Sequence, residues 1–284
     1  MARHRLLFTC PDRPGLIASV SAALKDAGAN IVTLDQHAEA GPLARFFMRT
    51  EFDLPSTADV EQLDAALKAV AEAVGAVWRR TPVDRPHRLG ILVSRETHCL
   101  AELLTQVGTG DIRAAVAFVW SNHADAKALA EADGIPYHHV PMDAVSKPAA
   151  EEKLLITAHR ARVDTLVLAR YMQILSPAFV DRFPSRIINI HHSFLPAFVG
   201  PRPYHQAHAR GVKLIGATAH YVTAELDAGP IIEQDVHRVD HRHGVADYRR
   251  IGRHVERTVL ARAVAWHVDE RVLVDGNRTV VFPW

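Results

Sequence analysis

An amide and an imidazole two residues apart are the side chains of this sequence best suited to stabilising negative charge. Asn189 and His191 lie in the run Asn-Ile-His-His-Ser-Phe-Leu-Pro, which follows the apolar pair Ile187 and Ile188. Alternate residues of a strand project to the same side, so a strand here would hold both side chains together at its carboxyl end. Donors fixed in this way can bind a carbonyl oxygen while it becomes an oxyanion.

A carboxylate that could complete such a site follows in a separate segment. Asp227 lies in the run Thr-Ala-Glu-Leu-Asp-Ala-Gly-Pro, whose glycine and proline indicate a loop. A positioned carboxylate can accept or relay a proton and can stabilise a neighbouring imidazolium. A lone Asn or His at a strand end is more often a turn former or a satisfied polar group. Because the pattern extends over both segments, we predict that Asn189, His191 and Asp227 are catalytic.

The two segments resemble the folate-dependent formyltransferase family, whose motif is Asn-x-His-x-Ser-Leu-Leu-Pro with a downstream Asp; Phe194 replaces the first Leu. The resemblance covers roughly residues 87–281 and implies that a reduced folate binds between two loops. Backbone groups would pair with the pterin ring and apolar side chains would cover its faces. For Met172, Ile174 and Leu175, core packing is the alternative. The folate-binding residues implied by the resemblance are Met172, Gln173, Ile174, Leu175, Thr223, Ala224, Glu225 and Leu226.

The formyl acceptor is inferred from features that other family members have and this sequence lacks. Glycinamide ribonucleotide transformylases cradle a phosphate with a glycine-rich loop, whereas the equivalent stretch Ser94–His98 contains no glycine and carries Glu96, which would repel a phosphate. Methionyl-tRNA formyltransferases carry an additional basic domain, for which this chain ends too soon. Water therefore remains as the acceptor, and no cofactor beyond the folate substrate is expected.

The paired His191-His192, the run His98-Cys99-Leu100 and the run 203–207 strengthen the resemblance to the family branch that hydrolyses 10-formyltetrahydrofolate to tetrahydrofolate and formate. His205 is expected to form a wall of the formyl site. The segment Val199–Arg202 differs from the family's usual Lys-Gly-Ala-Asn, so its contact with the folate tail stays open. The alternatives are a glycinamide ribonucleotide formyltransferase and a non-catalytic sensor of folate and amino acids.

The 18 histidines raise the question of a metal site. His205 with His208, and His241 with His243, have a feasible spacing for two ligands. Neither pair has a nearby set of cysteine and acidic partners in the sequence that would complete a tetrahedral site. We therefore predict no metal.

The first 81 residues are predicted to form a regulatory domain. Their pattern is strand, helix, two strands, helix, strand, which is the ferredoxin-like βαββαβ arrangement. The run Thr9–Ile17, with Pro-Asp-Arg-Pro-Gly inside it, resembles the start of an ACT domain, a module that binds amino-acid effectors. The resemblance implies a homo-oligomer, with effector identity, oligomer size and catalytic rate left open. The effector-binding residues that it implies are Asp12, Gly15, Asn30 and Ile31.

A linker is predicted at residues 82–87, followed by a catalytic domain at residues 88–284. Strands and helices alternate from Leu89 to Ile190, which predicts an α/β fold with a mostly parallel, doubly wound sheet. Two longer strands, 213–222 and 231–239, are expected to pair in antiparallel fashion around the Asp227 loop. A helix at 245–268 and a short hairpin turning at Asp275-Gly276-Asn277 are expected to follow.

Composition sets limits on the other classes of function. The sequence has 284 residues, a formal net charge of +1, and 48% hydrophobic and 23% charged residues, as is ordinary for a folded globular protein. Scattered Lys and Arg give no footprint for nucleic acid or for an anionic membrane. Cys10 and Cys99 fit buried thiols of a reducing compartment. No segment is typical of a signal peptide or a membrane span, so we expect a cytoplasmic protein.

Overall fold

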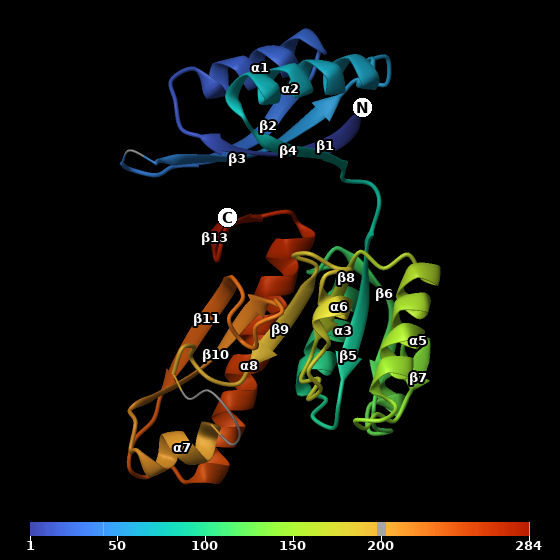
Figure 1. Ribbon diagram of the computed structural model, residues 1–284, viewed down its shortest axis with the longest axis vertical. Helices are drawn as coiled ribbons and strands as arrows, with labels where there is room; N and C mark the ends of the chain where they lie inside the picture. The colour runs from blue at the N-terminus through green and yellow to red at the C-terminus, as the bar shows by residue number, and fades with distance from the viewer. Residues whose placement is uncertain (42, 198–202, 284) are drawn as a thin grey trace. The chain divides into compact units, whose positions relative to one another are not determined.

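The computed structural model describes residues 1–41, 43–197 and 203–283, and its backbone is drawn in Figure 1. The chain divides into two compact units. The first comprises residues 1–86 with residues 270–273 and the residues from Val280 onward. The second comprises residues 87–269 with residues 274–279.

The first unit is a four-stranded antiparallel sheet with two helices. Its strands have the order β2-β3-β1-β4, and every pair is antiparallel. The predicted ferredoxin-like arrangement is therefore confirmed. Asp59 caps the second helix by accepting a hydrogen bond from the backbone of Gln62, and Gly75 ends this helix in a left-handed conformation. The elements are β1 (Ala2–Pro11), α1 (Leu16–Asp26), β2 (Asn30–Ala38), β3 (Arg45–Leu54), α2 (Val60–Val74) and β4 (Val77–Pro82).

A segment from late in the sequence belongs to this first unit. The carboxylate of Glu270 accepts hydrogen bonds from Thr81 Oγ1 at 3.0 Å and forms an ion pair with Arg79 Nη2 at 2.8 Å. The backbone oxygen of Glu270 accepts from Arg49 Nε at 3.1 Å. These three contacts attach the chain just after its last helix to β3 and β4.

The second unit is built on a seven-stranded sheet of order β11-β10-β9-β8-β5-β6-β7. Strands β5 to β9 are parallel, whereas β10 runs antiparallel to both β9 and β11. The mostly parallel sheet and the antiparallel pair are both confirmed. The elements are β5 (His87–Val93), α3 (His98–Thr109), β6 (Ala114–Ser121), α4 (Lys127–Ala132), β7 (Tyr137–His139), α5 (Lys147–Arg160), β8 (Thr165–Leu168), α6 (Pro177–Val180), β9 (Ile187–His191), α7 (Pro203–Ala209), β10 (Leu214–Tyr221), β11 (Ile231–Arg238) and α8 (Val245–Val268). The hairpin of β12 (Val272–Asp275) and β13 (Arg278–Val281) forms a separate two-stranded sheet whose residues are divided between the two units.

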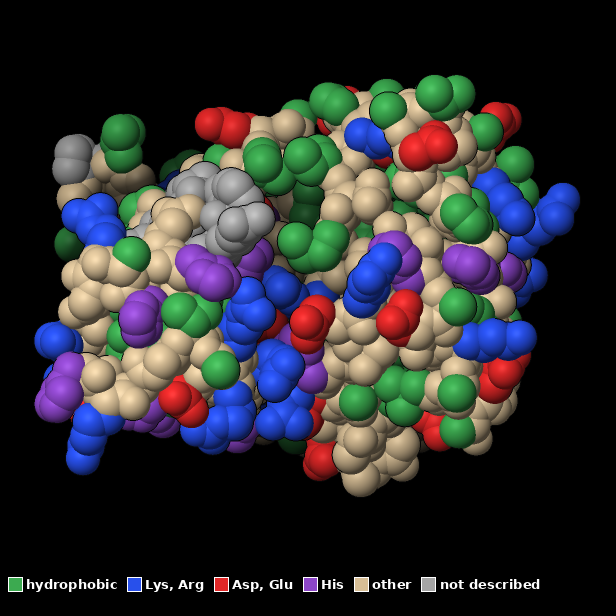
Figure 2. All heavy atoms as spheres, turned by 90° about the horizontal axis from the view of Figure 1, so that it is seen from below, with side chains coloured by type: hydrophobic (Ala, Val, Ile, Leu, Met, Phe, Trp, Pro, Cys, Tyr) green, Lys and Arg blue, Asp and Glu red, His purple; other side chains and the backbone are tan. Residues whose placement is uncertain are grey.

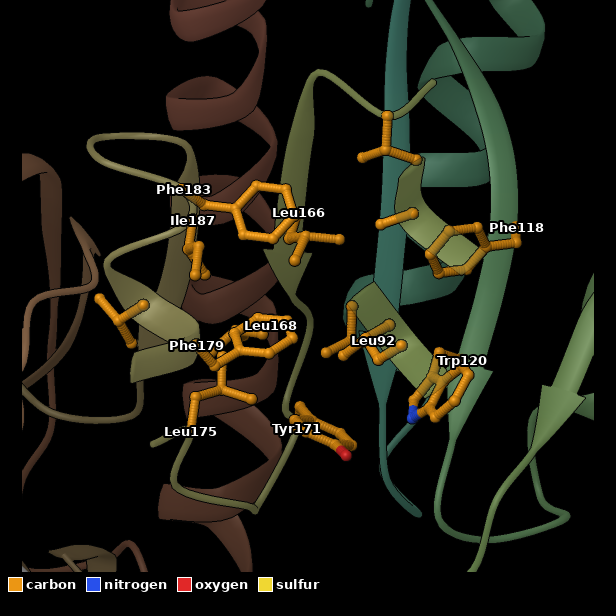
Figure 3. Close-up of a cluster of buried hydrophobic side chains, with 14 residues drawn as sticks. Leu92, Phe118, Trp120, Leu166, Leu168, Tyr171, Leu175, Phe179, Phe183 and Ile187 are labelled. Carbon is orange, nitrogen blue, oxygen red and sulfur yellow. The ribbon is translucent and has the colours of Figure 1, made fainter. Parts of the chain in front are cut away.

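Helices cover both faces of this sheet (Figure 1). On one face, Phe179 of α6 and Leu154 of α5 join a buried cluster with Leu92, Leu166 and Leu168 of the strands, as Figure 3 shows for most of its members. On the other face, α8 packs along β9, β10 and β11 and against α3. None of the helices in the described part of the chain has the length and apolar character needed to span a bilayer.

Candidate active site

The predicted amide and imidazole lie at the end of β9, between β8 and β10. His191 is opposite Thr218 of β10, and Asn189 is opposite His220. The amide nitrogen of Asn189 lies 3.2 Å from Nε2 of His220. The sheet therefore sets Asn189 beside a histidine that the sequence analysis did not single out.

A single carboxylate contacts both imidazoles. Asp227 Oδ2 lies 3.1 Å from His191 Nδ1, and Asp227 Oδ1 lies 3.6 Å from His220 Nε2. The structure thus brings Asn189, His191 and Asp227 together, as predicted, and adds His220. An imidazole in the mostly apolar strand β10 was the available sequence signal for His220, but its partners come from a different strand and a loop.

The loop from β10 to β11 is held tightly enough to fix Asp227. A Cβ atom at Gly229 would lie 1.9 Å from the backbone oxygen of Tyr221, so only glycine permits this approach. Tyr221 N also donates to Pro230 O at 2.9 Å. Asp227 itself has a φ of 55°, a left-handed conformation that costs free energy and is often found at functional positions.

The hydrogen bonds of the Asp227 carboxylate and the His191 ring indicate different roles for the two groups. Hydrogen bonds from His191 and His220 hold the pKa of Asp227 well below its usual range, although burial acts in the opposite direction. His191 Nε2 is buried and has no hydrogen-bond partner among the described residues. An unpaired polar atom in a buried position costs free energy until a ligand satisfies it. Because Nδ1 faces Asp227, Nε2 is the ring atom left for a ligand oxygen.

The loop after β8 lies on the other side of β9 and carries the first folate segment. Met172 and Ile174 are 59% and 62% exposed, unusually open for large apolar side chains, and Gln173 is half-buried. Met172 N donates to Ser94 Oγ at 3.0 Å, which anchors the loop to β5. Leu175 is only 7% exposed and belongs to the core shown in Figure 3. Its side chain is therefore not a wall of an open site, and the core-packing alternative holds for this residue.

The second folate segment surrounds Asp227 in the loop after β10. Thr223 is half-buried, whereas Ala224, Glu225 and Leu226 are exposed, Leu226 to 59%. Thr223 Oγ1 donates to the backbone oxygen of Glu225 at 3.1 Å. Since β8 and β10 are the two neighbours of β9, the two predicted folate segments flank the strand that carries Asn189 and His191.

His205 does not join this group, contrary to expectation. It is exposed on α7 and its Nε2 lies 2.7 Å from Nη2 of Arg249. Figure 2 shows histidine and basic side chains lying next to one another on one face of the molecule. Tyr204, the neighbour of His205 on α7, is buried, with 8% exposure. The segment Val199–Arg202 lies outside the described residues.

A buried ionic network that the sequence analysis missed lies behind His192. Glu256 of α8 is 1% exposed. Its carboxylate accepts hydrogen bonds from Tyr204 Oη and from His98 Nε2, the latter at 2.8 Å, and Arg170 Nε lies 3.4 Å away. Burial raises the pKa of Glu256, but the hydrogen bond from His98 and the charge of Arg170 outweigh it and lower the pKa. The four residues come from α3, the loop after β8, α7 and α8, so no local sequence motif predicts the network.

His192 lies between this network and the ring of His191. Its ring centroid is 5.3 Å from that of His191 and 5.9 Å from that of Tyr204. Burial, and next the positive charge of Arg170, lower the pKa of His192 to about 3. His192 is therefore a neutral side chain at physiological pH.

One group of described residues has a geometry that could hold a metal ion. Ligand atoms of His98, Cys99 and Glu256 lie within 4.8 Å of one another. Two of the three ligands are already engaged with each other, and Arg170 beside Glu256 adds a positive charge that opposes a cation. Burial raises the pKa of the Cys99 thiol well above its usual value, so the thiolate that a metal needs is disfavoured.

The residues expected to bind an effector are not brought together within one chain. Asp12 and Gly15 follow the end of β1, where Gly15 has a φ of 91°. Asn30 and Ile31 begin β2, and Asn30 pairs with Asp53 beside the start of β1. The two pairs are thus at opposite ends of the sheet, separated by about 26 Å at about 3.3 Å per residue. One protomer cannot form a single small-molecule site from all four.

Comparisons with known proteins agree with both parts of this description. The formyl transferase family model matches residues 87–264, and the ACT domain model matches residues 4–74. A formyltetrahydrofolate deformylase of Bacillus subtilis is 50% identical over 281 residues, which cover 99% of this chain and 94% of that protein. The crystal structure of a formyltetrahydrofolate deformylase from Pseudomonas syringae is 46% identical, with a TM-score of 0.94 and coverage of 99% and 95% of the two chains.

A structure with a different name shares only the second unit's fold. The glycinamide ribonucleotide transformylase 1 of Symbiobacterium toebii is 35% identical, with a TM-score of 0.64, over 69% of this chain and 94% of that chain. The same scaffold therefore occurs in proteins named for transfer to an amine.

Proposed function

Because the chain belongs to the formyltetrahydrofolate deformylase family, we propose that it hydrolyses 10-formyltetrahydrofolate to tetrahydrofolate and formate. The observation that carries the proposal is the arrangement of the Asp227 carboxylate and the two ring nitrogens of His191 at the end of β9. Asp227 lies 3.1 Å from His191 Nδ1, and the opposite ring atom, Nε2, is buried without a partner in the described chain. A buried ring nitrogen without a partner, on a ring whose other nitrogen faces a carboxylate, suits donation to an oxyanion.

The oxyanion forms when water attacks the formyl carbon. In the proposed mechanism, the Asn189 amide and the charged form of His191 donate hydrogen bonds to the developing negative oxygen. The amide is oriented by His220, whose Nε2 lies 3.2 Å from Asn189 Nδ2. Preorganised donors of this kind typically contribute a factor of about 10² to 10³ each.

The proton of water and the leaving nitrogen complete the reaction. Asp227 accepts or relays the proton that water loses, and N10 takes up a proton as its bond to the formyl carbon breaks. Hydrogen bonds from His191 and His220 lower the pKa of Asp227, so the Asp227 carboxylate stays charged at neutral pH. It therefore suits stabilising His191 and relaying a proton better than retaining one. Since the reaction is a substitution at a carbonyl carbon, no cofactor beyond the folate substrate is required.

The folate is proposed to bind between the loops after β8 and β10. The exposed side chains of Met172, Ile174 and Leu226 would cover the faces of its ring, and backbone groups of Gln173, Leu175 and residues 223–226 would pair with its edge. Burial of three exposed apolar side chains by a flat ligand is favourable, at about 25 cal/mol per Å².

We also propose that residues 1–81 form a regulatory domain that binds an amino acid, and that the chain is a cytoplasmic homo-oligomer. The match to the ACT domain model over residues 4–74 supports the regulatory part. A thermal-shift panel of the common amino acids on the full chain tests the effector, and sedimentation velocity tests the oligomer. An absence of any shift, or a monomer at micromolar concentration, contradicts these proposals.

The test of hydrolysis is formate release from 10-formyltetrahydrofolate without any amine acceptor. We expect formate and tetrahydrofolate in equal amounts, and no increase when glycinamide ribonucleotide is added. Formyl transfer that requires glycinamide ribonucleotide would favour the transferase alternative. Folate binding with no turnover under either condition would favour the non-catalytic sensor.

A further inference from the structure

Within the second unit, three aromatic rings lie in contact in the order His191, His192 and Tyr204. The ring of His191 lies 5.3 Å from that of His192, which lies 5.9 Å from the ring of Tyr204. Tyr204 is 8% exposed, and His192 is partly buried. On this side of His191 the space next to the reacting atoms is thus occupied by His192, with Tyr204 behind it.

Helix α8 fixes Tyr204 in one position. The hydroxyl of Tyr204 donates a hydrogen bond to Glu256. One helical turn earlier, a Cβ atom at Gly252 would lie 2.0 Å from the same hydroxyl oxygen, so the ring rests on bare helix backbone. Glu256 in turn accepts from His98 Nε2 at 2.8 Å. Tyr204 is therefore held by a buried carboxylate that is itself held by α3.

A small cavity lies beside the row of rings. It has a volume of about 30 Å³ and is lined by residues that include His192, Phe194, Tyr204 and Ile215. Because Tyr204 lines this cavity together with His192, loss of its ring would enlarge the space next to His192.

The scaffold itself does not impose this limit. The Symbiobacterium toebii protein that shares the fold at 35% identity is named a glycinamide ribonucleotide transformylase, so the same sheet and helices occur with an amine acceptor. A restriction of the formyl acceptor to water in this chain must therefore come from its own side chains.

We propose that Tyr204, held by Glu256 and Gly252, fixes His192 against His191 and thereby restricts the acceptor of the formyl group to water. The inference rests on the proposed function and names the residues that determine acceptor specificity. Tyr204 and Glu256 are positioning residues, because they act through His192 and do not touch the reacting atoms.

The reaction that this wall prevents is formyl transfer to a small amine. Its nitrogen would form a bond to the formyl carbon and lose one proton, while the bond from that carbon to N10 breaks and N10 gains one proton. No oxidation or reduction is involved. Hydroxylamine is a suitable probe, because its product, formohydroxamate, gives a coloured iron(III) complex and can be measured beside formate.

The measurement is the ratio of formohydroxamate to formate at a fixed hydroxylamine concentration, corrected for the reaction without enzyme. We expect the wild-type protein to form formate with a ratio near zero. Tyr204→Phe keeps the ring but loses the hydrogen bond to Glu256, so its ratio should lie between those of wild type and Tyr204→Ala. Tyr204→Ala frees His192 to move, and the ratio should rise at least about tenfold, the scale on which pocket size discriminates between substrates.

Tyr248→Ala is the matched control. Tyr248 is also a buried tyrosine, 2% exposed and in the same small apolar cluster as Tyr204, but its ring contacts His208 at 5.4 Å rather than His192. Its loss should reduce stability without changing the ratio. If Tyr204→Ala does not fold, His192→Ala removes the wall directly and should raise the ratio in the same way.

Three outcomes would overturn the proposal. One is a folded Tyr204→Ala protein that hydrolyses folate with the wild-type ratio. The second is an equal rise in Tyr248→Ala, and the third is wild-type protein that already transfers to hydroxylamine. A wild-type protein that releases no formate at all is a different result, because it contradicts the proposed function itself.

Discussion

At the scale of single residues, the charge of Asp227 is the feature on which the proposed chemistry depends most. Asp227→Asn keeps the size and hydrogen-bonding capacity of the side chain but removes the negative charge beside His191. We expect turnover to fall by a factor of about 10² or more, as for loss of a positioned acid–base group. Folate affinity should persist, because the proposed contacts are backbone groups and apolar side chains. Steady-state kinetics with separate folate-binding measurements check this.

The control for this variant is His191→Ala, alone and combined with Asp227→Asn. His191→Ala should cost a similar factor, and the double variant should lose much less than the product, because the two residues act as a unit. Near-normal turnover of Asp227→Asn would remove the carboxylate from the mechanism. Asn189 and His191 would then remain as oxyanion donors alone.

His192 gives a second residue-scale prediction, on stability against pH. Its pKa is lowered to about 3 by burial and Arg170, whereas in the unfolded chain it lies at about 6.5. Between these values the unfolded state binds the extra proton, so stability is present near pH 7 and falls as the pH decreases. The slope is at most about 1.4 kcal/mol per pH unit. Urea unfolding of His192→Gln between pH 7 and pH 5 should show a shallower slope.

The same measurement on His205→Gln is the matched control, because His205 is exposed and its substitution should leave the slope unchanged. The pH range ends at pH 5 so that the titration of Asp227 does not contribute to the slope. The pKa of Asp227 is lowered in the folded protein, so its contribution to stability is lost only below about pH 4. Equal slopes for wild type and His192→Gln would show that His192 does not stay neutral in the folded protein.

The three residues predicted to be catalytic lie together in the structure, but their surroundings could not be predicted from the sequence. Asn189, His191 and Asp227 stand in two continuous motifs, so their types and spacing were visible. His220, Arg170, Tyr204 and Glu256 come from β10, the loop after β8, α7 and α8. Their contacts exist only after the sheet has formed, and no spacing in the sequence encodes them.

At the scale of elements, helices with a clear apolar repeat were predicted with their observed bounds, Val60–Val74 and Val245–Val268. Helix α7 was not predicted. It follows a stretch rich in proline and glycine, which argues against a helix, and it has only seven residues. Its buried residues Tyr204 and Ala207 pack with Ile215 and Tyr248, so tertiary contacts rather than local preference favour this helix.

The loop after β10 carries the element-scale prediction. Gly229→Ala would place a Cβ atom 1.9 Å from the oxygen of Tyr221, so the loop must shift and carry Asp227 away from His191. We expect turnover to fall by about 10², with stability lowered by about 1 to 3 kcal/mol. Formate release and thermal unfolding measure the two effects.

Gly108→Ala is the matched control, because a Cβ atom there meets nothing within 4 Å and lies inside α3. Alanine is favoured over glycine in a helix by about 1 kcal/mol, so this variant should be as active as wild type and slightly more stable. A Gly229→Ala protein with normal turnover would mean that the loop tolerates the shift without moving Asp227.

At the scale of the whole molecule, the chain leaves the second unit at Asp269 and enters the first at Glu270. The helix that carries Glu256 is thus covalently continuous with the unit proposed to bind an effector. The predicted boundary gave residues 88–284 to one domain, because residues 270–273 show no local sign of contacting a sheet formed some two hundred positions earlier. Contacts between residues so distant in sequence depend on the completed fold.

Glu270 provides the corresponding test, since its side chain is 10% exposed and paired with Arg79 and Thr81. Glu270→Ala leaves two donors of the first unit without their acceptor, which should lower the stability of that unit by about 1 to 3 kcal/mol. Hydrogen exchange of backbone amides should accelerate in β1 and β4 more than in the strands β5 and β8. Lys68→Ala, which removes an ion pair whose partners are both 69% exposed, should change exchange little, because exposed pairs contribute at most about 1 kcal/mol. Unchanged exchange in β4 of Glu270→Ala would mean that residues 270–273 do not stabilise the first unit, and any effector response would then have to reach α8 by another route.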